Sequence, residues 1–166
     1  MDLNEGRQKF LQAWGTIGTN WGISRTMAQV HALLLVSDVA LTTENIMDEL
    51  NISRGNANQN IRALMDWGLI TKEIKSGDRK EYFNAEKDIW KVSRMIARER
   101  RKRELEPALK ILEELQTIKE NNQPAKNFKK VITEIHDYTG MVNSLLEKYI
   151  HSNNNWLIRL FSHMMK

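Results

Sequence analysis

The hydrophobic residues of the first 67 positions recur at spacings of three and four, which is the period of an α-helix. Phe10, Trp14, Ile17 and Trp21 follow this spacing, and the stretch around VHALLLV is apolar on nearly all sides, as in a buried helix. Thr42 to Asn45 form a helix start with an acid in the first turn, and Asn51-Ile52 interrupts the pattern. Four helices are therefore predicted, over residues 4–21, 25–37, 42–50 and 53–67.

After Gly68, a residue typical of the end of a helix, the period changes from helical to alternating. Residues 69–74 (LITKEI) and 81–83 (EYF) have strand composition, and Ser76-Gly77-Asp78 between them is a turn signal. No other stretch of the chain shows such alternation. One β-hairpin is predicted here.

The rest of the chain returns to helical spacing. A helix is expected from about Ala85 through ARERRKRE (97–104) until Pro107 breaks or restarts it, and NNQP (121–124) is expected to be a loop. A further helical stripe falls on Leu109, Leu112, Leu115 and Ile118. Beyond the loop, apolar residues occupy the a and d positions of three heptads, the pattern of a coiled coil: Phe128, Ile135, Val142 and Tyr149 in one series, and Val131, Tyr138 and Leu145 in the other.

Composition excludes several classes of protein. The chain is 41% hydrophobic, too apolar for a disordered protein, and has no run near the about 20 apolar residues that span a bilayer. Residues 1–9 lack the apolar core of a signal peptide, so we expect a cytoplasmic protein with no membrane partner. The absence of cysteine excludes disulfides and thiolate metal sites, and the four histidines have no metal-ligand spacing. With no nucleophile elbow, phosphate loop or carboxylate pair, we expect no enzyme activity, cofactor or metal.

The net charge of +4 is concentrated in one part of the chain. Residues 53–103 carry fourteen Lys and Arg against seven Asp and Glu, whereas residues 1–52 carry three against six. Residues 104–166 are balanced at eight against eight. A basic central third is either a solvated surface or the footprint of a nucleic-acid-binding face.

The predicted order of helix, helix, turn, helix and hairpin is that of a winged helix-turn-helix. In residues 53–67 the apolar Ala57, Ile61, Leu64 and Met65 form one stripe, and polar residues lie opposite: Arg54, Asn58, Gln59 and Arg62, with Asn56 at the edge. Arginine pairs with guanine, and asparagine or glutamine with adenine. Three asparagines and a glutamine lie within five residues of this helix. Glu, Lys and Ala form helices more readily, so this composition favours DNA readout over a helix surface that is merely polar.

Residues at the start of this helix, on the hairpin and further along the chain are also candidates for contact with DNA. Ser53 is placed to cap the helix, to donate to a phosphate, or to do both. The hairpin carries Lys72, Lys75, Arg79 and Lys80, which on a wing reach phosphates or the minor groove. RRKR at 100–103 either contacts DNA outside the wing or keeps its helix solvated.

The stretch TTENIMDELNISRGNANQNIRALMDWGLITKEIKSGDRKEYF resembles the DNA-binding core of MarR-type regulators. The opening GRQKFLQAWGTIGTNWGISRTMAQVHALLLVS, the LNISRGNANQNIRAL region and the long helix after the hairpin are more closely similar to the GbsR branch. The resemblance covers about residues 5–115. The family's wing has an Asp-x-Arg-like element, which Asp78-Arg79 matches loosely, because the two residues are adjacent in this chain. The resemblance implies a homodimeric transcriptional regulator, usually a repressor, whose best-known relatives respond to choline or glycine betaine.

Five aromatic residues are candidates for an effector pocket, because aromatic cages hold quaternary ammonium groups by cation–π attraction. They are Phe10, Trp14, Trp21, Trp67 and Trp90. The alternative is that they pack the core and a dimer interface. The terminal WLIRLFSHMMK is likewise open between a membrane-surface segment and packing within the dimer.

Together these observations predict a mostly α protein with a small β-hairpin wing. Residues 1–105 are expected to form a winged helix-turn-helix DNA-binding domain, and residues 106–166 a helical dimerisation extension. The expected function is sequence-specific binding of double-stranded DNA by a homodimer on a pseudo-palindromic operator. The alternative from another class is a winged-helix protein–protein adaptor with no specific DNA site, which would expose apolar anchors on residues 53–67.

Overall fold

The computed structural model describes residues 1–20 and 22–152. The chain forms two compact units, Met1–Val92 and the segment that begins at Ser93. The functional division expected at residue 105 stays a prediction. Trp21, a candidate effector residue, lies outside the described residues. The same is true of the terminal WLIRLFSHMMK, which was expected to be either a membrane-surface segment or part of the packing within the dimer. Within the described part, no helix is both long and apolar enough to cross a bilayer.

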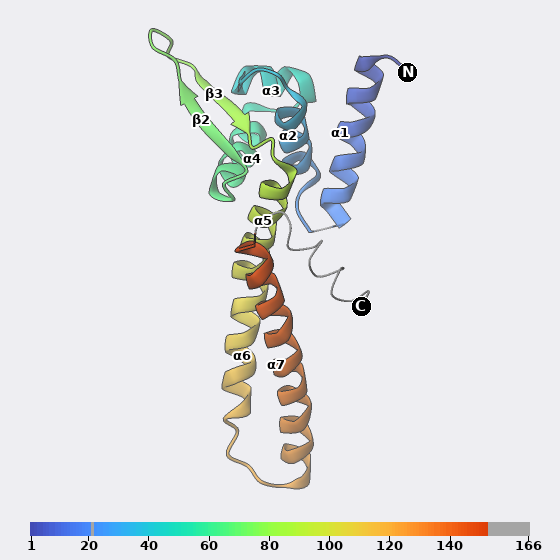
Figure 1. Cartoon of the computed structure of the whole chain (residues 1–166), viewed down its shortest axis with the longest axis vertical. Coiled ribbons are helices and arrows are strands. Elements are labelled where there is room, and N and C mark those ends of the chain that lie inside the picture. The colour runs from blue at the N-terminus through green and yellow to red at the C-terminus, as the bar shows by residue number, and fades with distance from the viewer. Residues whose placement is uncertain (21, 153–166) are drawn as a thin grey trace. The chain divides into compact units, whose positions relative to one another are not determined.

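The first unit confirms the predicted winged helix-turn-helix, four helices followed by a β-hairpin (Figure 1). Each helix lies within one or two residues of its predicted bounds, and the two main strands follow Gly68 as expected. The elements are α1 (Leu3–Asn20), α2 (Arg25–Val36), β1 (Leu41–Thr42), α3 (Thr43–Leu50), α4 (Arg54–Asp66), β2 (Ile70–Ile74) and β3 (Glu81–Ala85).

The sheet has a strand that the sequence analysis missed. Its order is β1-β3-β2, all antiparallel, and Leu41 of β1 pairs with Phe83 of β3. A strand of two residues is too short to show alternation, and it exists because β3 offers its free edge to the residues that lead into α3. The wing is therefore the outer hairpin of a three-stranded sheet.

The expected helix start near Ala85 is wrong. Ala85 ends β3, where it pairs with Ile70, and α5 (Ile89–Arg100) begins four residues later. The reason is Asp88, whose carboxylate accepts hydrogen bonds from the backbone N–H groups of Trp90 at 2.9 Å and Lys91 at 3.2 Å. An aspartate that caps the first free donors of a helix sets its beginning.

The core of the first unit surrounds α2, the helix predicted to be buried. Glycines on α1 allow that helix to approach α2 closely, since a Cβ atom at Gly18 would lie 2.4 Å from the Cβ of Ala28. Gly15 has side-chain atoms of α2 at 3.0 Å from the same position. The fully buried large side chains are Val30, Leu33, Leu34, Ile46, Leu64 and Phe83.

The two helices of the helix-turn-helix are held by local caps. Thr42 and Asn45 form a capping box at the start of α3, and Ser53 caps α4 by accepting from the N–H of Asn56 at 3.3 Å. Between them Asn51 adopts a left-handed conformation with φ of 50°. The turn therefore ends α3 on an asparagine, one of the few residues besides glycine that adopts this conformation readily.

Lys87 ties the residues after the wing to α2. Its Nζ donates to the carbonyl oxygens of Leu34, Leu35 and Ser37 at 2.6, 2.8 and 2.7 Å. These carbonyls lie at the C-terminus of α2, where backbone acceptors have no partner within the helix and the helix dipole favours a cation. Burial lowers the pKa of Lys87.

His31 is buried in α2 beside Trp14, and its Nε2 has no hydrogen-bond partner among the residues that the structure describes. Burial, with the Lys87 charge nearby, lowers the pKa of His31 from 6.5 to about 4. Between pH 6.5 and pH 4 the imidazole of His31 is therefore protonated in the unfolded chain and neutral in the folded protein. The contribution of His31 to the free energy of unfolding is thus fully present above pH 6.5 and is lost as the pH falls towards 4.

We expect the free energy of unfolding to fall by about 2 kcal/mol between pH 7.5 and pH 5 through His31 alone. Urea unfolding followed by circular dichroism at the two pH values measures the loss. His31→Leu removes the titrating group and should lose much less over the same interval. His136→Gln, outside this core, is the control and should behave as the wild type does. An unchanged loss in His31→Leu would contradict the prediction.

The second unit is a helical hairpin in which α6 (Glu106–Gln116) and α7 (Gln123–Ile150) lie side by side (Figure 1). α5 passes into a π-helical turn at Arg101–Leu105, and α6 then begins with Pro107 in its first turn. Proline lacks an N–H, and its ring crowds the carbonyl four residues earlier in an α-helix, so the wider turn accommodates it. Of the two outcomes expected at Pro107, a break or a restart, the structure shows a restart, with α6 beginning at Glu106.

The heptad residues of α7 are not the ones that pack the hairpin. The side chains buried on α7 are Ala125, Ile132 and Ile150. Five of the seven heptad residues instead expose between 41% and 65% of their surface, and we call these five the apolar seam: Phe128, Val131, Ile135, Tyr138 and Leu145. Val142 and Tyr149 are half-buried. The single chain thus leaves most of the heptad positions of α7 exposed.

Candidate nucleic-acid interface

The two faces of α4 differ as the sequence predicted. Ala57, Ile61 and Leu64 are buried against the rest of the first unit, whereas Met65, expected in the same stripe, is half-buried. On the other side Arg54, Gln59 and Arg62 are exposed, and Asn56 and Asn58 are half-buried. The exposed side of this helix carries hydrogen-bonding groups and no large apolar side chain.

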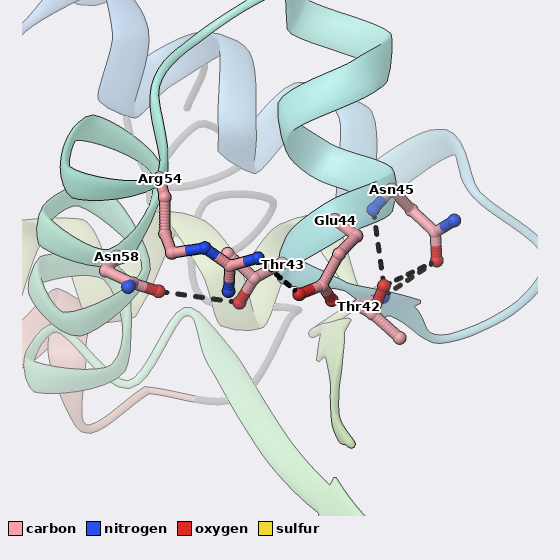
Figure 2. A network of polar contacts seen from close by, with 6 residues as sticks. All are labelled: Thr42, Thr43, Glu44, Asn45, Arg54 and Asn58. Atoms are coloured by element: carbon pink, nitrogen blue, oxygen red, sulfur yellow. Dashed lines mark hydrogen bonds and ion pairs between the residues drawn. The ribbon is translucent and has the colours of Figure 1, made fainter.

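Arg54 and Asn58 are held by residues at the start of α3 (Figure 2). The Nη2 of Arg54 lies 2.8 Å from Oε1 of Glu44, and the Thr43 hydroxyl donates to Oδ1 of Asn58 at 3.5 Å, at the long limit of a hydrogen bond. Hydrogen bonds from its own backbone N–H and from Arg54 hold the pKa of Glu44 below its usual range. The first residue of α4 is therefore ion-paired to an ionised carboxylate.

Asn60 is structural, although the sequence analysis counted it among the polar residues that favour DNA readout. It is buried, and its amide nitrogen donates to the carbonyl and side-chain oxygens of Asn56 at 2.9 and 2.7 Å. Its own Oδ1 accepts from the hydroxyl of Ser24, the cap of α2, at 3.2 Å. One of the three asparagines thus joins α4 to α2 and faces away from solvent.

The wing presents its four predicted basic residues in two ways. Lys72 pairs with Glu81 across the hairpin at 2.8 Å, and Lys75 lies 4.0 Å from the ring centre of Tyr82. Arg79 and Lys80 are exposed at the tip. All four side chains are exposed, and Lys72 and Lys75 in addition contact residues of the strands.

The loop at the tip is organised by Asp78. Its carboxylate accepts from the Tyr82 hydroxyl at 2.6 Å and from the backbone N–H of Lys80 at 3.0 Å. The Tyr82 bond, followed by the Lys80 bond, lowers the pKa of Asp78, and the same Asp78 bond raises the pKa of Tyr82. Gly77 supplies the positive φ of 80° that the turn needs. These bonds fix the backbone of the turn and thereby the position of Arg79 on it.

A hollow of about 370 Å³ lies between α4 and the wing. Asn58 and Arg62 line it from α4, and Lys72 and Glu81 line it from the strands. Its floor is apolar and consists of Ile61, Met65 and Phe83. The structure therefore brings residues predicted for base reading and for backbone contact to one concave surface.

The RRKR cluster at 100–103 is engaged within its own unit. Arg101 donates from Nε to Oδ1 of Asn143 at 2.8 Å and pairs with Glu106 at 3.2 Å. Arg103 donates to Glu99 at 3.0 Å. Arg101 thereby joins the π-helical turn to α7. Lys102 and Arg103 are exposed, and a DNA contact by this cluster stays a prediction.

Four of the five predicted effector residues lie in the described chain, on α1, at the end of α4 and on α5. Phe10 and Trp14 have ring centres 5.4 Å apart on α1, and Trp14 lies 6.3 Å from His31. Trp67 caps the end of α4, and Trp90 is on α5. Phe10 also lines a cavity of about 570 Å³ near the start of α1. A quaternary-ammonium site stays a prediction.

Thr43 and Glu44 belong to this surface, although neither was predicted to. In the sequence Glu44 is an acid in the first turn of α3, where a negative charge is favourable by itself. What the sequence does not show is that α3 starts beside the first turn of α4. The order of elements in a helix-turn-helix is the one signal that could have placed them together.

Comparisons with known proteins agree with this geometry. Residues 21–81 match the family model described as MarR family, which covers the helix-turn-helix and most of the wing. A crystal structure described as a transcriptional regulator aligns with a TM-score of 0.67 at 20% identity, over 87% of this chain and 95% of that one. At this identity the likeness establishes a shared fold.

Two other solved structures align with TM-scores of 0.38, too low to establish a shared fold: an S. aureus MepR mutant bound to an oligodeoxyribonucleotide, and the transcriptional regulator SlyA. The first is 11% identical over 98% of this chain and 88% of that one, the second 16% identical over 90% and 97%. No curated protein matches the chain. The GbsR branch stays a prediction, and the conclusion is that this chain carries a winged helix-turn-helix whose residues 21–81 match the MarR family.

Proposed function

We propose that this protein is a transcriptional regulator that binds a specific sequence of double-stranded DNA. The observation that carries the proposal is the surface formed by α4 and the wing. Arg54, Gln59 and Arg62 are exposed on the helix, and Arg79 and Lys80 are exposed on the wing tip. An adaptor would be expected to expose apolar anchors on α4, and the exposed side of this helix has none.

The two parts of the surface have different roles in this proposal. Helix α4 enters the major groove, where Arg54, Asn58, Gln59 and Arg62 meet base edges, with Asn56 at the border. Ser53 lies at the N-terminus of the helix, where a phosphate is favourable. Lys72, Lys75, Arg79 and Lys80 hold the phosphate backbone, which positions the protein and supplies affinity without sequence information.

The regulator is proposed to act as a homodimer through the apolar seam of α7. Side chains that repeat every seven residues along one helix are the pattern by which two helices pack over a long distance. A two-fold symmetric dimer carries two copies of α4, so the operator is expected to be pseudo-palindromic. Occupying such a site next to a promoter would make the protein a repressor, with a small-molecule effector as a further hypothesis.

The proposal is tested by selecting preferred duplexes from a random-sequence library with the purified protein. Fluorescence anisotropy then compares the selected duplex with a scrambled duplex at two salt concentrations. We expect a preference of at least about a thousandfold for the selected sequence, and an inverted repeat within it. Weak and equal binding to both duplexes would show a basic protein without an operator. No binding at low salt would favour the adaptor.

A further inference from the structure

The ion pair between Arg54 and Glu44 places a negative charge on the surface proposed to meet DNA. Both side chains are exposed, at 60% for Arg54 and 46% for Glu44. Exposed ion pairs of this kind contribute little to stability. A carboxylate there also repels phosphates, so it opposes the binding of DNA of any sequence. The pair has no evident purpose in folding and an unfavourable effect on non-specific DNA binding.

The position of Arg54 suggests what the pair does. Arg54 is the first residue of α4, and in a helix-turn-helix the N-terminal residues of the recognition helix contact base edges. The bond to Glu44 uses one N–H of Nη2, which leaves the second N–H of Nη2 and the N–H groups of Nε and Nη1 to meet acceptors. Arginine presents five N–H donors in a rigid fork, so one edge can be held by a carboxylate while another meets a guanine.

We propose that Glu44 is a specificity-determining positioning residue: it holds the Arg54 guanidinium for a guanine and keeps it from the phosphates. An unrestrained arginine at this position has many conformers and is attracted to any nearby phosphate. An arginine held by a carboxylate has fewer conformers and a partly neutralised charge. It therefore gains more from the two acceptors of guanine than from a phosphate oxygen. This inference rests on the proposed function.

The second contact from α3 supports the same arrangement. The Thr43 hydroxyl donates to Oδ1 of Asn58, one turn after Arg54 on the same side of α4 (Figure 2). That bond leaves the amide nitrogen of Asn58 as the donor available to DNA. Two successive residues of α3 thus contact two side chains proposed to read bases.

The test uses the selected and scrambled duplexes and four variants of the full-length protein: E44Q, R54A, the double variant, and E49Q. Glu49 is exposed five residues further along α3, so E49Q removes the same charge from the same helix. We expect E44Q to strengthen binding to scrambled DNA and to lower the ratio of selected to scrambled affinity about tenfold. In the R54A background, E44Q should leave that ratio unchanged. E49Q should leave it unchanged as well.

Several results would overturn the inference. One is that E44Q does not lower the ratio of selected to scrambled affinity. Another is that E44Q lowers this ratio equally in the R54A background. The third is that E49Q lowers the ratio to a similar extent, which would indicate a general charge effect. In each of them the wild type still prefers the selected duplex, and the proposed function stands. If the library yields no preferred sequence for the wild type, the proposed function fails and this inference with it. We expect E44Q to have the same melting temperature as the wild type, which would exclude a folding defect as the cause of a changed ratio.

Discussion

Ile135→Glu is expected to convert the protein from a dimer to a monomer and to weaken binding to a duplex with two half-sites by at least about a hundredfold. Ile135 lies in the middle of the apolar seam and is 45% exposed in the single chain, so the chain can fold with a carboxylate there. A two-fold interface would bury two such carboxylates without partners, which is unfavourable by several kcal/mol.

The loss of DNA affinity follows from the loss of the second half-site. When two winged domains are joined, binding of the second occurs at a high effective concentration. A monomer retains the contacts of one half-site alone. Its affinity for a duplex with a single half-site should therefore stay close to that of the wild-type protomer.

Sedimentation equilibrium measures the oligomeric state of the variant, and anisotropy on the two duplexes measures its affinity. Thr133→Glu is the matched control, because Thr133 is exposed on the same helix and lies outside the apolar seam. It should remain dimeric and bind as the wild type does. If Ile135→Glu stays dimeric with unchanged affinity, the seam is not the interface.

Arg62→Ala is expected to lower affinity for the selected duplex by about 1–3 kcal/mol and to relax base preference at one position. Arg62 is exposed on α4, two turns after Arg54 on the same side, and lines the hollow beside the wing. Its planar donors match the two acceptors of guanine, and replacing it removes discrimination as well as charge.

Arg79→Ala provides the comparison that separates base reading from phosphate contact. At the wing tip it should weaken selected and scrambled duplexes alike and lower the slope of log affinity against log salt by about one. Repeating the library selection with both variants measures base preference directly. If Arg62→Ala selects the same sequence as the wild type, Arg62 is not a base-reading residue.

Much of the first unit could be predicted because its signals are local. Gly68 ends α4 with φ of 73°, and the capping residues Thr42 and Ser53 stand directly before the helices that they start. Such signals depend on the side chains and backbone of a few neighbouring residues. They can therefore be recognised in the sequence without knowledge of the tertiary structure.

What could not be predicted depends on contacts between distant residues. Asn60 is polar and lies among polar neighbours, but the Ser24 hydroxyl meets it from α2 and makes it a buried link. The two residues of β1 are a strand only because β3 lies beside them. The contact between Glu44 and Arg54 likewise spans the turn of the helix-turn-helix. In each case the partner, and not the residue type, decides the role.

The close approach of α1 to α2 limits how the first unit can change shape. With the backbone at Gly18 too near Ala28 to admit a Cβ atom, α1 cannot rotate about its axis without driving its neighbouring side chains into α2. It also cannot slide by one turn, since the gap at Gly15 and Gly18 would no longer face the same part of α2. The two helices are thus interlocked, and they move as a single body in any rearrangement that leaves the core packed.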